Sequence, residues 1–326
     1  MLTSDPTARP GVISITGASG FLGFELTKGL ARRADIEIRA LTRHAAIPPF
    51  DCVGNFVPIR GNLAEPSTLA ELLRPGCSVA NFAFDAAASR EENLATAEAL
   101  ANGCITHRVK RVLHCSTAIV VGATSNKRVD ELTECRSRSD YEKTKLAIES
   151  LLRKKARGRF ELVILRPTAV FGPGGRNLLK MANDLTHGSR LLNQLRSFAN
   201  GRRQLNLVAA ENVAAAAIYL LGANAIDQEV FIISDDEAPA NNYHDVERLF
   251  IDALAMPANP IGYKLPQSAL SLLLRMRGRS LVYPGTRFSC DKLKRHGFEK
   301  PVKFDVALTE FISWYKLSRT GATNRG

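Results

Sequence analysis

With 326 residues, 45% of them hydrophobic and 23% charged, the chain can bury a sizeable core and has the composition of a globular protein. Its longest uncharged apolar run is too short to span a bilayer and residues 1–10 lack a signal peptide's apolar centre, which predicts a cytoplasmic protein without integral membrane association. The net charge of +12 favours anionic partners such as phosphorylated cofactors or substrates.

The first predicted elements are a strand, a glycine-rich turn and a helix. β-Branched residues over 12–15 favour a buried strand, and leucines that recur every four residues from Leu22 to Leu30 indicate one face of a helix. Three regularly spaced glycines lie between them: Gly17, Gly20 and Gly23. Because the free N–H groups at a helix start attract anions, this turn predicts a site for the pyrophosphate of a dinucleotide.

A second strand is predicted over 36–41 and ends at Thr42-Arg43. In dinucleotide-binding folds this strand end faces the adenosine ribose, where an acidic residue binds the 2′-hydroxyl. Here Arg43 takes the place and could pair with a 2′-phosphate through two hydrogen bonds. The sequence therefore predicts NADP as the cofactor, with NAD possible and a solvated Arg43 as the alternative.

The rest of the chain alternates predicted strands and helices. Further strands are predicted over 56–63 with its exit turn, 78–83, 111–117, 160–165, 205–208 and 229–233. Helices are predicted over 68–73, 92–102, from 141 through 152, and after Asn212. This alternation predicts parallel β-α-β units with a ligand crevice at the carboxyl ends of the strands. Six residues should share that rim: Gly20, Arg43, Asn62, Ala83, Thr117 and Pro167.

Tyr141 and Lys145 open the predicted helix one turn apart, so they share one face. An ammonium beside a phenol favours the tyrosinate and should lower the pKa of Tyr141. This makes Tyr141 a candidate proton donor and acceptor for an alcohol or ketone. The six cysteines form no C-x-x-C pair and no metal-like spacing, so we expect reduced thiols and no metal site.

Together these motifs resemble an extended short-chain dehydrogenase/reductase, in the broad group of NAD(P)-dependent epimerases, dehydratases and ketoreductases. The glycine turn and Tyr141-x-x-x-Lys145 match the family's two signatures, and the resemblance extends from Gly11 to about Leu317. Residues 115–122 resemble its serine/threonine strand, and 165–174 its L-R-P-x-x-V-Y-G-P-G segment beside the nicotinamide. Asn93 and a strand over 208–213 also fall at characteristic positions.

The resemblance implies a Rossmann-type doubly wound parallel sheet with a smaller, mostly C-terminal substrate lobe. Residues 11–172 and 203–235 would form the dinucleotide-binding domain, 173–202 and 236–319 the substrate lobe, and 1–10 and 320–326 flexible tails. A homodimer is expected, again by resemblance.

The resemblance also assigns roles to single residues. Thr117, Tyr141 and Lys145 would be catalytic: Tyr141 moves the proton, Thr117 orients the substrate oxygen, and Lys145 holds the nicotinamide ribose. The cofactor would contact Gly17, Ser19, Gly20, Phe21, Leu22, Gly23, Arg43, Asn62, Leu63, Phe82, Ala83, Cys115, Tyr141, Lys145, Pro167 and Val170. The substrate would contact Ser116, Asn177 and Arg203.

The sequence departs from the family pattern at several positions. Asn62 stands where aspartate is usual beside the adenine, and Val121 replaces a common tyrosine. Ala118 and Ile119 stand where sugar-nucleotide 4,6-dehydratases carry an Asp-Glu pair for eliminating water, which argues against dehydratase chemistry.

Three functions remain open at this point. The first is a 4-epimerase or ketoreductase of a nucleotide sugar, with Arg202 and Arg203 on a strand and at most one of them essential. The second is a reductase or dehydrogenase of a more apolar ketone or alcohol, like the hydroxysteroid or dihydroflavonol branches, suggested by apolar residues 268–274 followed by Arg275, Arg277 and Arg279. The third is a non-catalytic redox sensor, disfavoured because Tyr141 and Lys145 are both present. A nucleic-acid partner is not expected, since aromatic and basic residues do not interleave.

Overall fold

The computed structural model describes residues 11–43, 54–256 and 285–323, with side chains as far as Arg319. The predicted N-terminal tail and the apolar-to-basic segment 268–279 lie outside the described residues. The chain divides into two compact units, each made of three stretches. The first unit takes the chain up to Thr117, Ser139–Arg166 and Ala214–Phe231. The second takes Ala118–Arg138, Pro167–Val213 and the chain from Ile232 on.

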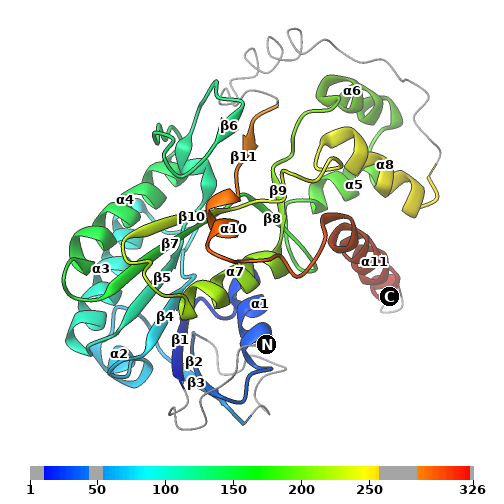
Figure 1. Cartoon of the computed structure of the whole chain (residues 1–326). Coiled ribbons are helices and arrows are strands. Elements are labelled where there is room, and N and C mark those ends of the chain that lie inside the picture. The colour runs from blue at the N-terminus through cyan, green and yellow to red at the C-terminus, as the bar shows by residue number, and fades with distance from the viewer. Residues whose placement is uncertain (1–10, 44–53, 257–284, 324–326) are drawn as a thin grey trace. The chain divides into compact units, whose positions relative to one another are not determined.

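The first unit is built around the seven-stranded sheet in Figure 1, with the order β10-β7-β5-β4-β1-β2-β3. Its strands are β1 (Gly11–Thr16), β2 (Ile36–Thr42), β3 (Phe56–Arg60), β4 (Ser78–Asn81), β5 (Arg111–Cys115), β7 (Glu161–Pro167) and β10 (Glu229–Ile233). Every pair whose register is described is parallel. The prediction of a Rossmann-type doubly wound sheet is therefore confirmed, and the strand order reverses between β1 and β4, where such folds bind ligands.

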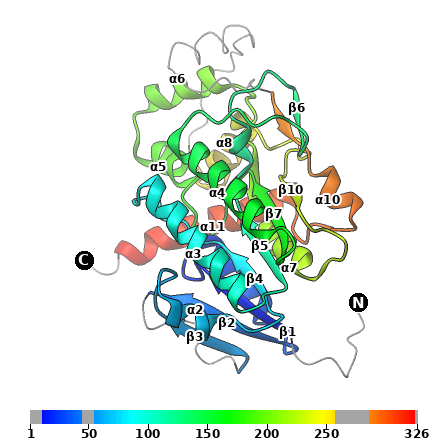
Figure 2. The same ribbon diagram turned by 90° about the vertical axis from the view of Figure 1, so that its left-hand side faces the viewer.

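Helices cover both faces of this sheet, as Figures 1 and 2 show. The helices α2 (Pro66–Leu72), α3 (Arg90–Thr106) and α4 (Asp140–Ala156) lie on one face, and α1 (Phe21–Leu30) and α7 (Ala210–Gly222) on the other. Buried residues of α2, α3 and α4 form one apolar core with the strands, among them Leu72, Leu100, Leu152, Val112 and Leu162. Because both faces are covered, the central strands are buried along nearly their whole length.

Two helices begin with the same capping box. The side chains of Ser89 and Ser139 accept the backbone N–H three residues later, and Glu92 and Glu142 reach back to the N–H of the capping serine. The second of these boxes fixes the first turn of α4, which carries Tyr141. The structure thus starts α4 at Asp140, one residue before the predicted start.

The second unit has its own core and two small sheets. It contains η2 (Ala118–Val121), β6 (Arg128–Val129), β8 (Ala169–Phe171), α5 (Leu179–His187), α6 (Arg190–Asn200), β9 (Leu207–Ala209), α8 (Tyr243–Ala253), β11 (Arg287–Phe288), α10 (Asp291–Arg295) and α11 (Phe304–Thr323). β8 pairs with β9 and β6 with β11, both in parallel. Phe171, Phe250 and Phe311 are fully buried, and Phe311 contacts each of the other two edge-on.

Several predicted boundaries are wrong in this unit. The strand predicted over 205–208 is β9, which pairs with β8 instead of extending the large sheet. The strand expected over 208–213 ends at Ala209, because α7 begins at Ala210. Helix α11 continues to Thr323, into the stretch assigned to a flexible tail. The predicted limits of the two domains differ from the limits of the two units. That one domain binds the dinucleotide and the other the substrate stays a prediction.

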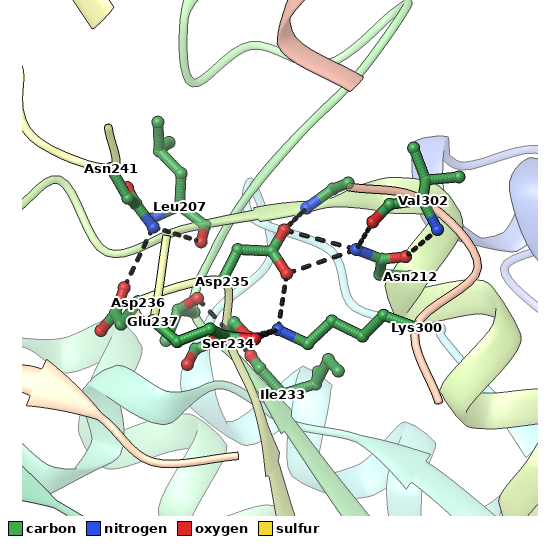
Figure 3. A network of polar contacts seen from close by, with 12 residues as sticks. Leu207, Asn212, Ile233, Ser234, Asp235, Asp236, Glu237, Asn241, Lys300 and Val302 are labelled. Carbon is green, nitrogen blue, oxygen red and sulfur yellow. Dashed lines mark hydrogen bonds and ion pairs between the residues drawn. The ribbon is translucent and has the colours of Figure 1, made fainter. Parts of the chain in front are cut away.

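A buried polar network holds together the end of β10 and the segment before α11 (Figure 3). Lys300 Nζ donates to Asp235 Oδ1 at 2.8 Å and to Glu237 Oε1 at 2.6 Å. Asn212 exchanges two hydrogen bonds with the backbone of Val302, at 3.0 and 3.1 Å, and also donates to Asp235. Asp235 and Asn212 are almost completely buried, so each polar atom satisfied here avoids a desolvation cost of about 1–3 kcal/mol.

Candidate active site

The turn after β1 packs so tightly on the start of α1 that two glycines, one in each, admit no side chain. Gly17 has φ +73°, and a Cβ there would lie 2.8 Å from the carbonyl carbon of Phe82 and 2.9 Å from the nitrogen of Ala83. A Cβ on Gly23 would lie 2.1 Å from the carbonyl oxygen of Gly17. The obstructing atoms are all backbone and cannot rotate away. The turn is therefore a close-packed backbone cradle at the point where the strand order reverses.

The start of α1 suits an anion. Its capping residue Gly20 offers no side-chain cap, and the first turn contains no acidic residue. Ser19 and Gly20 are exposed, while Phe21 and Leu22 are half-buried. The first N–H groups of a helix have no acceptor within it, and they carry the positive end of its dipole. The geometry fits a pyrophosphate, as the sequence predicts.

Arg43, directly after β2, faces a carboxylate that the sequence analysis missed. Its Nη1 lies 3.5 Å from Asp85 Oδ2, and the two side chains are 77% and 47% exposed. Asp85 follows β4, the neighbour of β1, so only the sheet order brings it near Arg43. Both signs of charge are therefore present where a 2′-phosphate would have to bind.

The predicted adenine-side residues after β3 differ in their surroundings. Asn62 is exposed and its Oδ1 accepts the N–H of Ala64 at 3.1 Å, so it shapes the turn. Leu63 is 5% exposed and belongs to the apolar core. Only its backbone could contact a cofactor.

Residues 82–84 connect the glycine turn to the Tyr-Lys pair. Phe82 and Ala83 abut Gly17, and the ring of Phe84 contacts Tyr141 edge-on with centroids 5.2 Å apart. Lys145 Nζ lies 4.4 Å from the centre of the same ring. Sequence reasoning missed Phe84, although its position next to two predicted cofactor residues was a usable signal.

Lys145 is a buried cation, 5% exposed, whose Nζ donates to the carbonyl oxygen of Cys115 at 3.2 Å. Burial, the largest cause, lowers the pKa of Lys145, while Cys115 and Glu149 raise it. The lysine thus joins α4 to the end of β5, next to Ser116 and Thr117.

The expectation that Lys145 lowers the pKa of Tyr141 is wrong. Partial burial, the largest cause, and the charge of Cys115 raise the pKa of Tyr141 to about 12. The reason is that the Lys145 ammonium is directed to Cys115 and Phe84, so the phenol loses hydration without a compensating charge. Tyr141 is nevertheless 41% exposed, which leaves it open to a substrate.

Ser116 and Thr117 lie beyond the end of β5, which stops at Cys115 rather than at Thr117. Both are buried, at 5% and 8% exposure. The hydroxyl of Ser116 has no hydrogen-bond partner among the residues that the structure describes. An unsatisfied buried hydroxyl next to Thr117 and Lys145 fits a position that a bound molecule completes.

The remaining predicted residues belong to the second unit. Pro167 is buried and Val170 half-buried, and Asn177 Nδ2 donates to the Val170 carbonyl at 2.6 Å. Arg202 and Arg203 are not on a strand: they follow Gly201, which has φ +48°, in the turn after α6. The prediction that they lie on a strand is therefore wrong. Arg202 Nη1 pairs with Asp245 Oδ2 at 3.0 Å.

The described part of the chain offers neither a metal site nor a membrane-spanning helix. None of its groups of His, Cys, Asp and Glu could hold a metal ion. None of its helices is both long and apolar enough to cross a bilayer. The cysteines in this part are free thiols: Cys77, Cys104, Cys115, Cys135 and Cys290.

Comparison with known proteins agrees with this geometry. Residues 13–234 match the model of the NAD dependent epimerase/dehydratase family. No curated protein matches the sequence significantly.

Solved structures share the fold at low identity. The dTDP-glucose 4,6-dehydratase of Bacillus anthracis, with NAD, has 16% identity and a TM-score of 0.70 over 95% of this chain and 98% of that one. The UDP-glucuronic acid 4-epimerase of Bacillus cereus, with NAD, has 18% identity and a TM-score of 0.72 over 95% and 98%. An enzyme of Bordetella bronchiseptica in complex with NAD+ has 14% identity and a TM-score of 0.71 over 94% and 98%.

Proposed function

The chain belongs to the NAD dependent epimerase/dehydratase family, and from this premise we propose that it is an epimerase or ketoreductase of a nucleotide sugar, with Tyr141 as the acid/base. The observation that carries the proposal is the link through residues 82–84. One end of this segment packs on the glycine turn, and Phe84 at the other end contacts both Tyr141 and Lys145. A dinucleotide cradle and a proton-transferring pair thus share one edge of one sheet.

The residues present fit a nicotinamide dinucleotide. The cradle at Gly17 and Gly23 would hold the pyrophosphate, and Lys145 would hold the nicotinamide ribose. When bound, the nicotinamide supplies or accepts the hydride. The proteins named in the comparison bind NAD, and some act on nucleotide sugars, which supports the same substrate class here.

The chain's own residues supply the proton and the orientation. Since the pKa of Tyr141 is raised to about 12, its phenol is protonated at neutral pH and can donate to a ketone oxygen. Thr117 would hydrogen-bond the same oxygen, and the unpartnered hydroxyl of Ser116 offers a second contact. Alcohol oxidation requires the reverse transfer, so it should be favoured by higher pH.

Dehydratase chemistry is not part of the proposal. Ala118 is fully buried and Ile119 is 43% exposed, and neither side chain can donate or accept a proton. An elimination of water needs such groups beside the substrate. The proposal extends to a phosphorylated sugar substrate, from the net charge of +12, and to a cytoplasmic location. It also extends to a homodimer, from the family resemblance.

Cofactor choice should depend on Arg43 and Asp85 together. We expect NADP(H) to bind more tightly than NAD(H), and Arg43→Ala to remove most of a preference of about tenfold. A charge-assisted hydrogen bond contributes about 1.5–3 kcal/mol, and exposure of Arg43 reduces that value. Asp85→Asn should strengthen NADPH binding a few-fold, because it removes a repelling charge 3.5 Å from the guanidinium.

Dissociation constants for NADPH and NADH, measured by fluorescence titration, test this expectation. Asparagine at position 85 can still accept the N–H of Ala87, which now donates to Asp85 Oδ1 at 3.0 Å, so the loop should be preserved. Equal constants for both cofactors in the unchanged protein would show that Arg43 only faces solvent.

Recognition of a diphosphate should depend on Arg203 more than on Arg202. Arg203→Ala is expected to raise KM for the best nucleotide sugar at least tenfold, with kcat changed less, because a diphosphate is held equally in ground and transition states. Arg202→Ala is the control: the family resemblance assigns Arg203, not Arg202, to the substrate, and Arg202 pairs with Asp245. If neither change moves KM, the diphosphate contact lies elsewhere.

The proposed function itself is tested by a substrate screen. Nucleotide sugars and apolar ketones are offered in parallel, with the co-purifying cofactor identified by mass spectrometry. Turnover of a nucleotide sugar supports the proposal. Turnover restricted to uncharged ketones would replace it with the apolar-substrate alternative, whose sequence support, residues 268–279, lies outside the described part of the chain.

A further inference from the structure

A buried ion pair lies one helical turn beyond Lys145. Arg166 Nε donates to Glu149 Oε1 at 3.0 Å, and Arg166 Nη2 to Glu149 Oε2 at 2.6 Å. The two side chains are 6% and 2% exposed. The pair joins α4 to β7 in a two-point geometry that permits little rotation. Residues 141, 145 and 149 follow one another at single-turn spacing, so Tyr141, Lys145 and Glu149 share one face of α4.

The Glu149 carboxylate supplies a negative charge to two buried cations. Lys145 and Arg166 are two buried cations, and burying an unpaired charge is costly. Several groups act on Lys145: the carbonyl and thiol of Cys115, the neighbouring His114 on β5, and the Phe84 ring. The carboxylate that acts on it within the described residues is Glu149.

We propose that Glu149 and Arg166 are positioning residues: their pair fixes α4 against β7, and the Glu149 carboxylate keeps Lys145 charged and in place for cofactor and Tyr141. This inference rests on the proposed function for the roles of Lys145 and Tyr141. Neither residue of the pair needs to touch a substrate. Glu149 and Arg166 act through the lysine and through the placement of the helix.

The chain contains a matched control for a purely structural role. Arg111 and Glu161 are the first residues of the adjacent parallel strands β5 and β7, and Arg111 Nε donates to Glu161 Oε2 at 2.7 Å, with Glu161 38% exposed. Arg111 is 5% exposed and also donates to the carbonyls of Leu220 and Leu221. This second pair secures the same sheet but lies at its amino edge, away from Lys145.

The test compares Glu149→Gln with Glu161→Gln. Without the Glu149 charge the pKa of Lys145 falls further, so the ammonium is lost at a lower pH. The alkaline limit of NADH affinity should then move down by about one pH unit, and kcat should fall at least tenfold. Glu161→Gln should lower Tm without moving that limit. Glu149→Asp, which keeps the charge, should restore the pH profile even where stability is not fully restored.

NADH affinity against pH is measured by fluorescence and needs no substrate, so it reports on the ion pair even if the proposed substrate class is wrong. Failure of the protein to turn over any nucleotide sugar would overturn the function but not this inference. Equal pH profiles for the unchanged protein and Glu149→Gln would overturn the inference. If Glu149→Gln does not fold, Glu149→Asp decides, because it keeps the carboxylate: an unchanged pH profile supports the proposal, and a profile shifted down by about one pH unit contradicts it.

Discussion

Replacing Tyr141 by phenylalanine is expected to lower kcat by about 10²- to 10⁴-fold, the range that a positioned acid/base contributes. The phenol is the proton donor of the proposed site, and its pKa of about 12 keeps it protonated at neutral pH. Phenylalanine preserves the edge-on contact with Phe84, so the helix start should not change. NADH affinity should therefore stay within a few-fold, measured by fluorescence titration beside steady-state kinetics.

Tyr315→Phe provides the control for loss of a tyrosine hydroxyl. Tyr315 is buried in the second unit, where its hydroxyl donates to Asn183 at 2.8 Å, so the change should affect Tm more than kcat. A Tyr141→Phe protein that keeps more than a tenth of the original kcat would remove Tyr141 from the mechanism.

Gly23→Ala should abolish dinucleotide binding or prevent folding. The added methyl would meet the Gly17 carbonyl at 2.1 Å, and the obstructing atoms are backbone. Overpacking typically costs about 1–3 kcal/mol even where side chains can move, so a backbone clash should exceed that. Because α1 must shift away from the turn, we expect NADH affinity to fall more than about a hundredfold in any protein that folds.

Gly222→Ala is the matched change. Gly222 is the last residue of α7, and a Cβ there meets nothing within 4 Å. That protein should fold with unchanged cofactor affinity, as shown by circular dichroism and the same titration. If Gly23→Ala binds NADH normally, the close packing of the turn is not what holds the pyrophosphate.

The sequence was sufficient to predict strands and helices where the local residue pattern agrees with the fold. Buried parallel strands read as apolar runs, and the glycine spacing with its flanking strand and helix marks one supersecondary unit. The elements around Gly17 and Tyr141 were therefore predicted nearly to the residue. β9 was placed in the wrong sheet, because three apolar residues carry no information about their pairing partner. The turn at Arg202 and Arg203 was missed because its positive φ at Gly201 is a property of the folded chain.

Other features of the candidate site depend on residues that only folding brings together. Asp85 reaches Arg43 because β4 and β2 flank β1, and Phe84 meets Lys145 although the two are far apart in the chain. The pKa of Tyr141 was predicted in the wrong direction because spacing on a helix gives proximity but not where an ammonium points. Hydration and orientation decide such shifts, and neither is visible in a motif.

The two units interleave along the chain, which affects both the synthesis of the protein and its cleavage by proteases. The first unit is complete only when Phe231 has been synthesised, after the chain has passed twice through the second unit and back. During much of translation, the nascent chain therefore contains incomplete forms of both units, with unpaired strands. No single cleavage separates the units either, so a protease that nicks one exposed loop should leave the fragments associated, and deletion of either terminal part should yield no independently folding piece.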